Sequence, residues 1–390
     1  MKKSLLALAL LSALAVSAQA AEINIYGKVD VGLQFKSVDN GLAGADRQNS
    51  LKMETGQTAG SRVGMTGWED LGNGYKVGFR LETGFTPDNG ALGQGNRLFG
   101  RQADLRIAGP FGTVKLGRMG ALASGYPDTG LFGGNVHPFA IGFSEVIGFR
   151  HIFTGNWAPL DNAITYSTPS FAGWQVIGQY SFDRDTTDKT TLKDGTHGTE
   201  NESTVDRFMA LGIRYVSDTT EFNFVIDSTN YATYGVNDKI RSWGDDDSLV
   251  VTTAVRHNLD FAKLYAGAQY YRDAREFTQD AYQSVGNADA KFLGGQGPRD
   301  GWALTVGADI PVPVGIAKVA IGYMDVENSL NSDESLKRYS VGIGYWYDLS
   351  KRTAFHAEMG YVHDKLDGER FKALDDANVW TANLGLVHNF

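Results

Sequence analysis

The sequence predicts an all-β protein: a 16-stranded antiparallel transmembrane β-barrel with an inward-folded third extracellular loop. Three observations predict the barrel. An amphipathic strand runs to the last residue, strand-like alternation recurs along the chain, and the connections alternate between short and long. A barrel that spans a membrane needs its last strand to pair with its first, because this closure satisfies the backbone groups of both edges.

The C-terminal strand alternates in polarity up to the end of the chain. From Trp380 to His388 every second residue is mostly apolar or aromatic, the residues between them are mostly small or polar, and the chain ends on Phe390. Chain termini of soluble domains tend to fray, so a well-formed amphipathic strand at a terminus needs a partner. We expect this strand to close on the first strand of a barrel.

The N-terminus has the pattern of a secretory signal peptide. Two lysines follow the initial Met, Leu5–Val16 is apolar, and Ala18–Ala20 is a small-residue cleavage site. The apolar stretch is too short for a membrane span. Residues 1–20 are therefore predicted to be a cleaved signal peptide and residues 21–390 the barrel; a retained N-terminal anchor is the alternative.

Composition favours a β protein that crosses a membrane without helices. The chain has 21 Phe, 17 Tyr, 7 Trp and 48 Gly but no Cys, and beyond the signal it has no apolar run near the roughly 18 residues of a membrane helix. Aromatic residues favour strands. Export without Cys means that stability does not rest on disulfides. The net charge of −9, or −11 without the two leader lysines, disfavours a nucleic-acid partner.

The first strand shows the alternation most clearly. Ile23, Val29 and Phe35 share one parity with other apolar residues, whereas Lys28 and Asp30 belong to the polar parity. Period 2 over this length indicates a strand with one apolar and one polar face. The same pattern predicts sixteen strands, centred on 23–35, 59–69, 75–85, 99–108, 112–118, 162–168, 172–183, 206–217, 220–230, 248–258, 261–272, 302–310, 315–326, 337–347, 352–364 and 379–390.

Short turns and long polar loops alternate between these strands. The predicted long loops are 36–58, 86–98, 119–161, 184–205, 231–247, 273–301, 327–336 and 365–378. Short periplasmic turns opposite long extracellular loops are typical of outer-membrane barrels, whereas a β-sandwich has no need of such alternation. Sixteen strands leave an aqueous lumen that side chains cannot fill.

Several segments in this order resemble the general porins of β-proteobacteria, the Neisseria- and Burkholderia-like group. They are Ile25–Asp30, Ser61–Gly64, Trp68–Gly74, Arg80–Phe85, Arg101–Ala103, Phe111–Arg118, Ser350–Thr353 and the closing His388–Phe390. The resemblance implies a homotrimer in the cell outer membrane, in contact with its lipid and lipopolysaccharide. It also implies a passive pore in each barrel for small hydrophilic solutes and ions. Phe390 resembles the end of the signal that the barrel assembly machinery reads.

The third long loop, 119–161, carries an unusual apolar load for a solvated segment. Its apolar residues include Phe132, Phe139, Ile141, Phe143, Val146, Ile147, Phe149, Ile152, Phe153 and Trp157. This composition argues against disorder. In such porins the third loop folds into the barrel and narrows the pore, and we expect the same here; contact with an extracellular partner is the alternative.

The sequence shows no enzyme constellation, no metal site and no cofactor motif. His137 and His151 lie in the third loop without a Cys or a tight acidic cluster, and they are interpreted as loop or rim histidines. No serine stands in a nucleophile-elbow context, and there is no phosphate-binding Gly motif. A barrel phospholipase remains an alternative for which no Ser/His pair can be nominated.

In the early strands, basic residues occupy positions that alternate with apolar residues. Lys28, Arg62, Lys76 and Arg80 alternate with apolar neighbours, which predicts that they point into the lumen. A guanidinium that faces lipid near the midplane costs about 2–4 kcal/mol, so the inward assignment has a physical reason. The alternative for each residue is an ion pair at the rim or with a loop.

The resemblance implies two further basic residues of the pore wall. Arg101 and Arg118 match basic positions of the family's pore wall, yet Leu105 shares a parity with Arg101 and Leu116 shares one with Arg118. Either the apolar face lies under the inward-folded loop there, or these arginines point elsewhere.

Porins of this kind oppose the basic wall with carboxylates on the third loop. The candidates are Asp128, Glu145 and Asp161. Because the loop has few acids, we expect a mild preference for anions.

Three functions fit the sequence. The leading hypothesis is a general diffusion porin without catalysis. The alternatives are a substrate-selective porin with a saturable site on the aromatic third loop, and a barrel that serves as an adhesin or receptor through loops 184–205 and 273–301.

Overall fold

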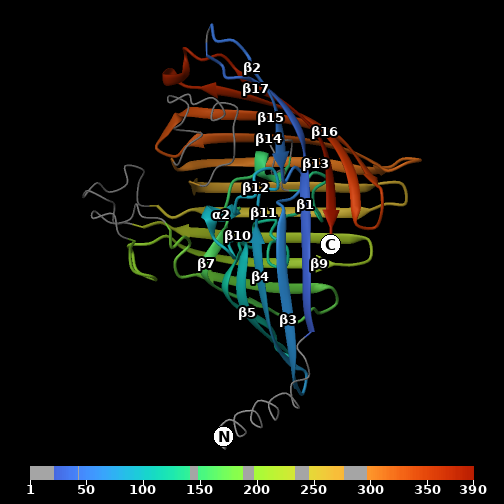
Figure 1. Ribbon diagram of the computed structural model, residues 1–390. Coiled ribbons are helices and arrows are strands. Elements are labelled where there is room, and N and C mark those ends of the chain that lie inside the picture. Colours follow the sequence, from blue (N-terminus) through green and yellow to red (C-terminus); the bar gives the residue numbers. More distant parts are fainter. Residues whose placement is uncertain (1–21, 43, 141–147, 188–196, 233–245, 276–296) are drawn as a thin grey trace, which may run out of the picture.

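The computed structural model describes residues 22–42, 44–140, 148–187, 197–232, 246–275 and 297–390. The predicted signal peptide lies outside these residues. The described chain is almost entirely antiparallel strand (Figure 1). The first strands are β1 (Glu22–Asp39), β2 (Gln48–Thr55), β3 (Arg62–Gly72), β4 (Tyr75–Gly84), β5 (Gln102–Gly109), β6 (Gly112–Gly120), β7 (Pro159–Ser167) and β8 (Trp174–Ser181). The others are β9 (Arg207–Val216), β10 (Thr220–Asn230), β11 (Leu249–Asn258), β12 (Lys263–Ala274), β13 (Arg299–Pro311), β14 (Ile316–Asn328), β15 (Asn331–Asp348), β16 (Thr353–Asp367) and β17 (Ala377–Asn389).

Helical structure in the described chain is confined to short turns in the connections. These are α2 (Gly93–Asn96), α3 (Phe149–Ile152) and η3 (Glu369–Phe371). Among the described residues, no helix is both long and apolar enough to cross a membrane.

The sheet closes on itself. From β3 onward each strand pairs with the next along the chain, β1 pairs with both β2 and β3, and β17 pairs with β1 from Lys28↔Asn389 to Asp39↔Asn378. The last residue continues this seam, because Phe390 N–H donates to Gly27 O (3.1 Å) and Gly27 N–H donates to Phe390 O (2.9 Å). The predicted closure of the C-terminal strand on the first strand is confirmed.

The barrel has sixteen strand positions, as predicted, although seventeen strand segments form it. Both β2 and β3 run antiparallel to β1: β2 pairs with Val31–Val38 and β3 with Glu22–Lys28. The two segments are therefore halves of one interrupted strand. The interruption, residues 56–61, leaves the sheet.

Two of the predicted long loops are shorter in the structure. β2 occupies much of the predicted loop 36–58, and β14 and β15 leave only Ser329 and Leu330 between them in place of the loop 327–336. Alternation of apolar and polar residues fades over residues 327–336, so the prediction ended β14 too early and began β15 too late. β2 keeps some alternation, with Leu51 and Met53 exposed, but the turn 56–61 separates it from β3 and the prediction counted it as part of the loop.

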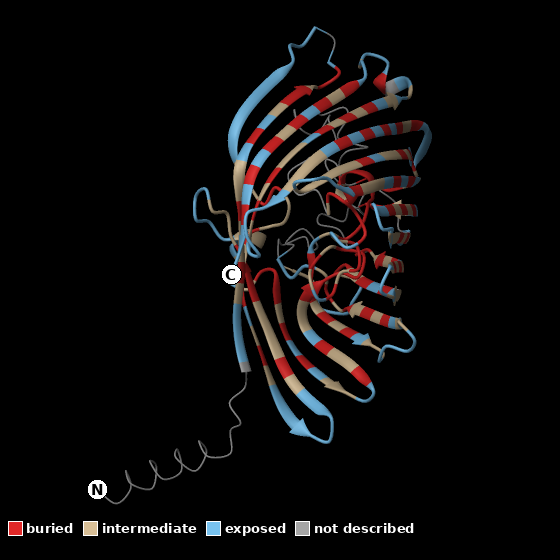
Figure 2. Ribbon diagram, turned by 90° about the vertical axis from the view of Figure 1, so that its right-hand side faces the viewer, coloured by how far each residue is buried: buried red, intermediate tan, exposed pale blue. Residues whose placement is uncertain are grey.

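The outward face is apolar and the inward face is mostly polar or covered. Along β1, Ile23, Ile25 and Leu33 are exposed outward, whereas Asp30 and Gln34 are buried. Figure 2 shows buried and exposed residues alternating along the strands. An apolar exposed surface of this extent suits contact with lipid.

The lipid-facing assignment of the strands can be tested on β14. Ile321 is 53% exposed on the outward face, so Ile321→Arg is expected to cost about 2–4 kcal/mol of barrel stability in lipid. Ile316→Arg on the same strand is the matched control, because Ile316 lines the inner cavity. The free energy of unfolding in urea, measured in vesicles, compares the two variants. Equal costs would contradict the assignment.

The closing seam can be tested at Phe390. Deleting this residue removes both backbone hydrogen bonds to Gly27, each contributing about 1 kcal/mol, whereas Phe390→Ala keeps them. The ring lies over Gly27, where a Cβ would come within 2.1 Å of it. We expect the deletion to lower the yield of folded barrel more than Phe390→Ala does, as measured by heat-modifiable mobility on gels. A deletion variant that matches the wild type would show that the seam does not need Phe390.

Candidate pore and its charged wall

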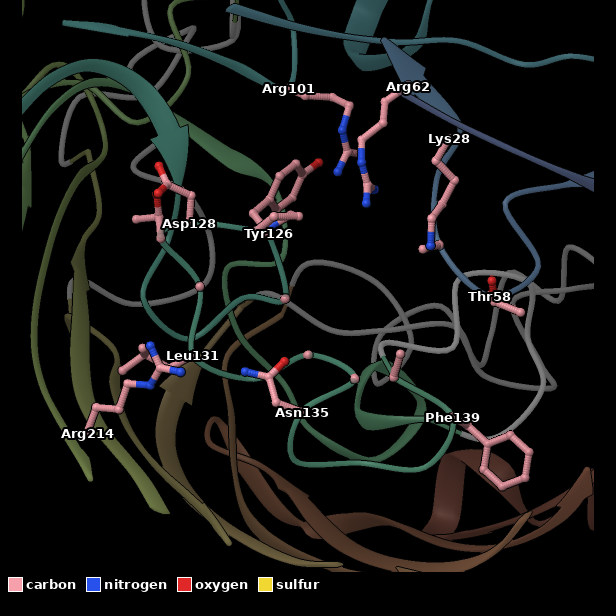
Figure 3. Close-up of a pocket in the computed structure, with 18 of the residues that line it drawn as sticks. Lys28, Thr58, Arg62, Arg101, Tyr126, Asp128, Leu131, Asn135, Phe139 and Arg214 are labelled. Carbon is pink, nitrogen blue, oxygen red and sulfur yellow. The ribbon is translucent and has the colours of Figure 1, made fainter. Parts of the chain in front are cut away.

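A cavity of about 770 Å³ lies inside the barrel, between the early strands and the third long loop (Figure 3). The charged residues that line it are mostly basic. They are Lys28, Arg62, Arg101, Arg106, Lys115, Arg214 and Lys318, with Asp128 and Glu358 as the acids. Seven cations against two carboxylates make this a positively charged passage.

Strand register brings the first cations together. Lys28 on β1 is the direct partner of Arg62 on β3, and Figure 3 shows both directed into the same space as Arg101. Like charges at this spacing repel each other, so they need a shared counter-ion. Glu82 on β4 supplies it.

The Glu82 carboxylate is buried at the centre of this group. Its oxygens lie 2.6 Å from Arg101 Nε, 3.8 Å from Arg62 Nε and 3.7 Å from Arg80 NH2. The Tyr26 hydroxyl donates to it as well, at 2.7 Å. One carboxylate thus holds three guanidinium groups, which leaves the group with a net positive charge.

Lys28 differs from these arginines. Within the described part of the chain its ammonium makes no ion pair and no hydrogen bond, although it lines the cavity. Asp30, two residues along the same strand, acts on Lys28 only at longer range, and a cation beside a passage without an ion-pair partner attracts mobile anions.

Asp128 forms the second ionic centre, from the third loop. Its Oδ2 lies 2.8 Å from Arg106 NH1, 3.0 Å from Lys115 Nζ and 3.6 Å from Arg80 NH1. Burial raises the pKa of Asp128, but Lys115, Arg106 and Arg80 outweigh burial and hold the pKa below its usual value. Asp128 is therefore neutralised against the basic wall instead of facing it across the passage.

The predicted basic residues occupy different places. Lys28, Arg62 and Arg101 line the cavity, and Arg80 lies between Glu82 and Asp128. Lys76 is the second residue of β4, directly after the short turn. It is exposed and does not line the cavity.

Arg118 and Asp161 form an ion pair away from the cavity. Asp161 is also held by Arg97 (2.6 Å) and by the Thr186 hydroxyl (2.7 Å), so the cluster joins two extracellular loops to β6 and β7. Glu145, the remaining acidic candidate, lies outside the described residues.

The structure explains why Arg101 and Arg118 share a parity with apolar residues. Leu105 and Leu116 are exposed outward, so the apolar face is not under the loop. Arg101 escapes the alternation because β5 begins only at Gln102. Near Arg118 the pairing of β6 with β7 shifts register between Gly117 and Met119.

The sequence prediction missed five charged residues that line the cavity, Arg106, Lys115, Arg214, Lys318 and Glu358, and the buried counter-ion Glu82. Arg106 alternates with Leu105 and Ile107, and Lys115 alternates with Val114 and Leu116, so the parity rule alone places both inward. Glu82 follows from the parity of Arg80 in the same way.

The third long segment, residues 121–158 between β6 and β7, packs against the inner wall in its described parts. Phe132, Phe149, Ile152 and Phe153 are fully buried. The anchoring hydrogen bonds are Leu122 N–H to Gln179 Oε1 (3.0 Å), Asn223 Nδ2 to Leu131 O (2.6 Å), Asn135 Nδ2 to Glu221 Oε1 (3.0 Å), Lys318 Nζ to Pro138 O (3.0 Å), Arg338 NH1 to His151 O (2.7 Å) and Thr154 N–H to Gln269 Oε1 (2.7 Å). The acceptors and donors on the wall belong to β8, β10, β12, β14 and β15.

His137 and His151 are buried in this packing and are not rim residues. His137 lies 3.3 Å from the Thr305 hydroxyl, and its Nδ1 accepts from Phe139 N–H (3.1 Å). Burial, aided by Lys318, lowers the pKa of His137 to about 3. Within the described ranges no group of His, Asp and Glu has the arrangement of a metal site.

Across the cavity from Lys28 and Arg62 lies another cation, Arg214 on β9, which is paired with Glu221 at 3.0 Å (Figure 3). Lys318 on β14 and Glu358 on β16 also line the cavity, and Lys318 is paired with Asp309 at 2.9 Å. The described residues therefore carry basic groups on both sides of the cavity.

Comparison with known proteins identifies the class. The Gram-negative porin family matches residues 7–367, and the chain belongs to this family. The chain is 29% identical, over 412 residues and the full length of both proteins, to an outer membrane porin protein of Bordetella pertussis. It is also 29% identical to the major outer membrane protein P.IB of Neisseria gonorrhoeae, over 93% of this chain and 94% of that protein.

The fold has solved counterparts. The anion-selective porin from Comamonas acidovorans superposes with a TM-score of 0.62 at 22% identity, covering 95% of this chain and all of that one. The chain is thus an outer-membrane porin, and its family and fold are those of channels.

The ionisation of Asp128 predicts how its effect on ion selectivity depends on pH. A carboxylate with a lowered folded pKa stabilises the fold above its unfolded pKa of about 3.9 and loses that effect only as the pH falls through the folded pKa. Asp128→Asn should shift the reversal potential in a KCl gradient toward greater anion preference. The difference between the wild type and Asp128→Asn should stay constant from about pH 8 to about pH 5, because Asp128 remains ionised over that range. A wild-type shift between those pH values that is absent from Asp128→Asn would show that Asp128 titrates there.

Proposed function

We propose that this chain is a general diffusion porin that prefers anions among small hydrophilic solutes and ions. The observation that carries the proposal is the charge of the cavity wall: seven Lys and Arg side chains against two carboxylates. One of these carboxylates, Asp128, is already engaged by three cations. Passage needs no chemistry, only a water-filled lumen whose field favours one sign of charge.

The preference should be mild. Unit charges about 4 Å apart interact with only about 1 kcal/mol in bulk water, and most of the wall cations have protein partners that offset part of their field. Lys28 is the largest contributor in this view, because it has no ion pair within the described residues. The third loop narrows the passage by filling the space under β8 to β15, and its tip brings Asp128 and Tyr126 to the cavity.

The family supports further expectations about assembly. The mature chain, residues 21–390, forms a homotrimer after cleavage of the signal peptide 1–20. Its outer surface contacts outer-membrane lipid and lipopolysaccharide, and Phe390 serves the barrel assembly machinery. The seam between Phe390 and Gly27 gives this last role a structural basis.

No described feature favours the other two functions. The aromatic residues of the third loop are used for packing: Phe132, Phe149 and Phe153 are fully buried, while Tyr126 and Phe139 alone among its described aromatic residues line the cavity. The loops considered for adhesion, 184–205 and 273–301, lie partly outside the described residues.

Planar bilayers test the proposal directly. The refolded barrel should give stepwise, ohmic conductance and a reversal potential of the anion-preferring sign in a KCl gradient. Neutral sugars of graded size should pass up to an exclusion limit without saturable block. Absence of stepwise conductance, or strong cation preference, would overturn the proposal.

Lys28 should contribute more to selectivity than a lysine outside the cavity. Lys28→Gln is expected to move the reversal potential toward zero, because it removes a cavity charge that has no ion-pair partner in the described part of the protein. Lys76→Gln makes the same change on an exposed lysine near the turn and should leave selectivity unchanged. Equal shifts in the two variants would show that net charge, and not the cavity wall, sets the preference.

A further inference from the structure

The interrupted strand inserts a second element into the lumen. β2 meets β1 at Val31↔Thr55, and β3 meets it at Lys28↔Arg62. Two residues of β1 therefore face six residues, 56–61, on the opposite strand. The excess cannot fit in the sheet, and Gln57, Thr58 and Ala59 line the cavity, so this turn bends inward.

Asp30 holds this turn from the inner face of β1. Its Oδ1 accepts from Gln57 N–H (3.1 Å), and its Oδ2 accepts from Thr58 N–H (2.8 Å), Ala59 N–H (3.0 Å) and the Thr58 hydroxyl (2.6 Å). The Asp30 side chain is fully buried. A carboxylate that accepts four hydrogen bonds is a strong and directional anchor, because bonds to an ionised acceptor are roughly twice as strong as neutral ones.

The backbone around Asp30 reinforces the anchor. Gly56 N–H donates to Asp30 O (2.9 Å), and Asp30 N–H donates to Ser61 Oγ (2.9 Å), so both ends of the turn are tied to one residue. His356 Nε2 lies 3.8 Å from the Asp30 carboxylate on the inner face of β16.

The wall beneath the turn is shaped to receive it. The Gln57 amide lies over Gly32 and Gly385, where a Cβ at either position would come within 2.3 Å of Gln57 Oε1. Gln57 Nε2 also donates to Leu33 O (3.0 Å). Two glycines on adjacent strands thus leave the space that a side chain would fill.

From this geometry we infer that the turn 56–61 is a second constriction element, opposite the third loop, and that Asp30 is the residue that positions it. The turn places Thr58, whose hydroxyl donates to Asp30, and its neighbours Gln57 and Ala59 beside the passage near Lys28; Figure 3 shows Thr58 and Lys28 on the same side of the cavity, away from Tyr126 and Asp128. Passing anions therefore meet Lys28 beside a polar, fixed turn. The inference rests on the proposed channel function.

A single cysteine tests the place of the turn. The chain has no Cys, so Thr58→Cys offers one thiol to a negatively charged, thiol-reactive sulfonate reagent. We expect labelling to reduce the single-channel current and to lower anion preference, because bulk and negative charge enter beside Lys28. Leu330→Cys, in the exposed connection between β14 and β15, is the matched control and should be labelled without effect. An unchanged current after labelling of the Thr58→Cys variant, or an equal loss in the labelled Leu330→Cys variant, would overturn the inference.

The role of Asp30 is tested with neutral solutes, which are insensitive to the charge change itself. Asp30→Asn and Asp30→Ala should raise the exclusion limit for neutral sugars, with the larger rise in Asp30→Ala, because the turn loses its anchor. Asp39→Asn removes a carboxylate from the exposed end of the same strand and should leave the limit unchanged. Unchanged limits in both Asp30 variants would overturn the positioning role.

The same experiment distinguishes failure of the proposed function from failure of the second constriction. A wild-type barrel without stepwise current would remove the proposed function itself. Wild-type current with no response to labelling in the Thr58→Cys variant would remove the second constriction alone. Heat-modifiable mobility on gels shows which Asp30 variants are folded, and where one is not, the Thr58→Cys result decides.

Discussion

The structure depends on closing the hydrogen-bond ladder between β1 and β17. In a bilayer an unpaired backbone N–H or C=O costs several kcal/mol, so an open edge is not tolerated. The seam from Lys28↔Asn389 to Asp39↔Asn378, extended by Gly27 and Phe390, removes both edges at once. Closure also fixes the direction of every side chain, since alternate residues must face lipid or lumen.

The polar lumen follows from that constraint. Once Leu33 and Ile321 face lipid, their alternating neighbours face water or other inward groups, and charged side chains are tolerated there. The charged residues of the wall are not evenly spread. Glu82 and Asp128 each gather several cations, and breaking such a buried pair typically costs about 3–5 kcal/mol because an uncompensated charge remains. The positive excess is therefore part of a cross-linked structure and not a set of loose side chains.

Much of the candidate site was predictable from alternation. Lys28, Arg62 and Arg80 were placed inward correctly by parity, and the same rule would have found Arg106, Lys115 and Glu82. Parity gave no clear answer for Arg101, which precedes the first residue of its strand and yet lines the cavity. Parity also placed Lys76 inward, but Lys76 is exposed at the end of its strand. Asp161 lies beside a register shift and pairs with Arg97 and Arg118.

The sequence by itself determined the barrel: period-2 alternation, sixteen strand positions and the aromatic terminus express a local rule that each residue faces either lipid or lumen. Tertiary structure alone decided how the lumen is filled. The engagement of Asp128 by the basic wall, the burial of His137 and the inward turn held by Asp30 all join residues from distant strands. Such contacts depend on which segments lie close together across the closed barrel. The period-2 alternation along one strand does not specify this.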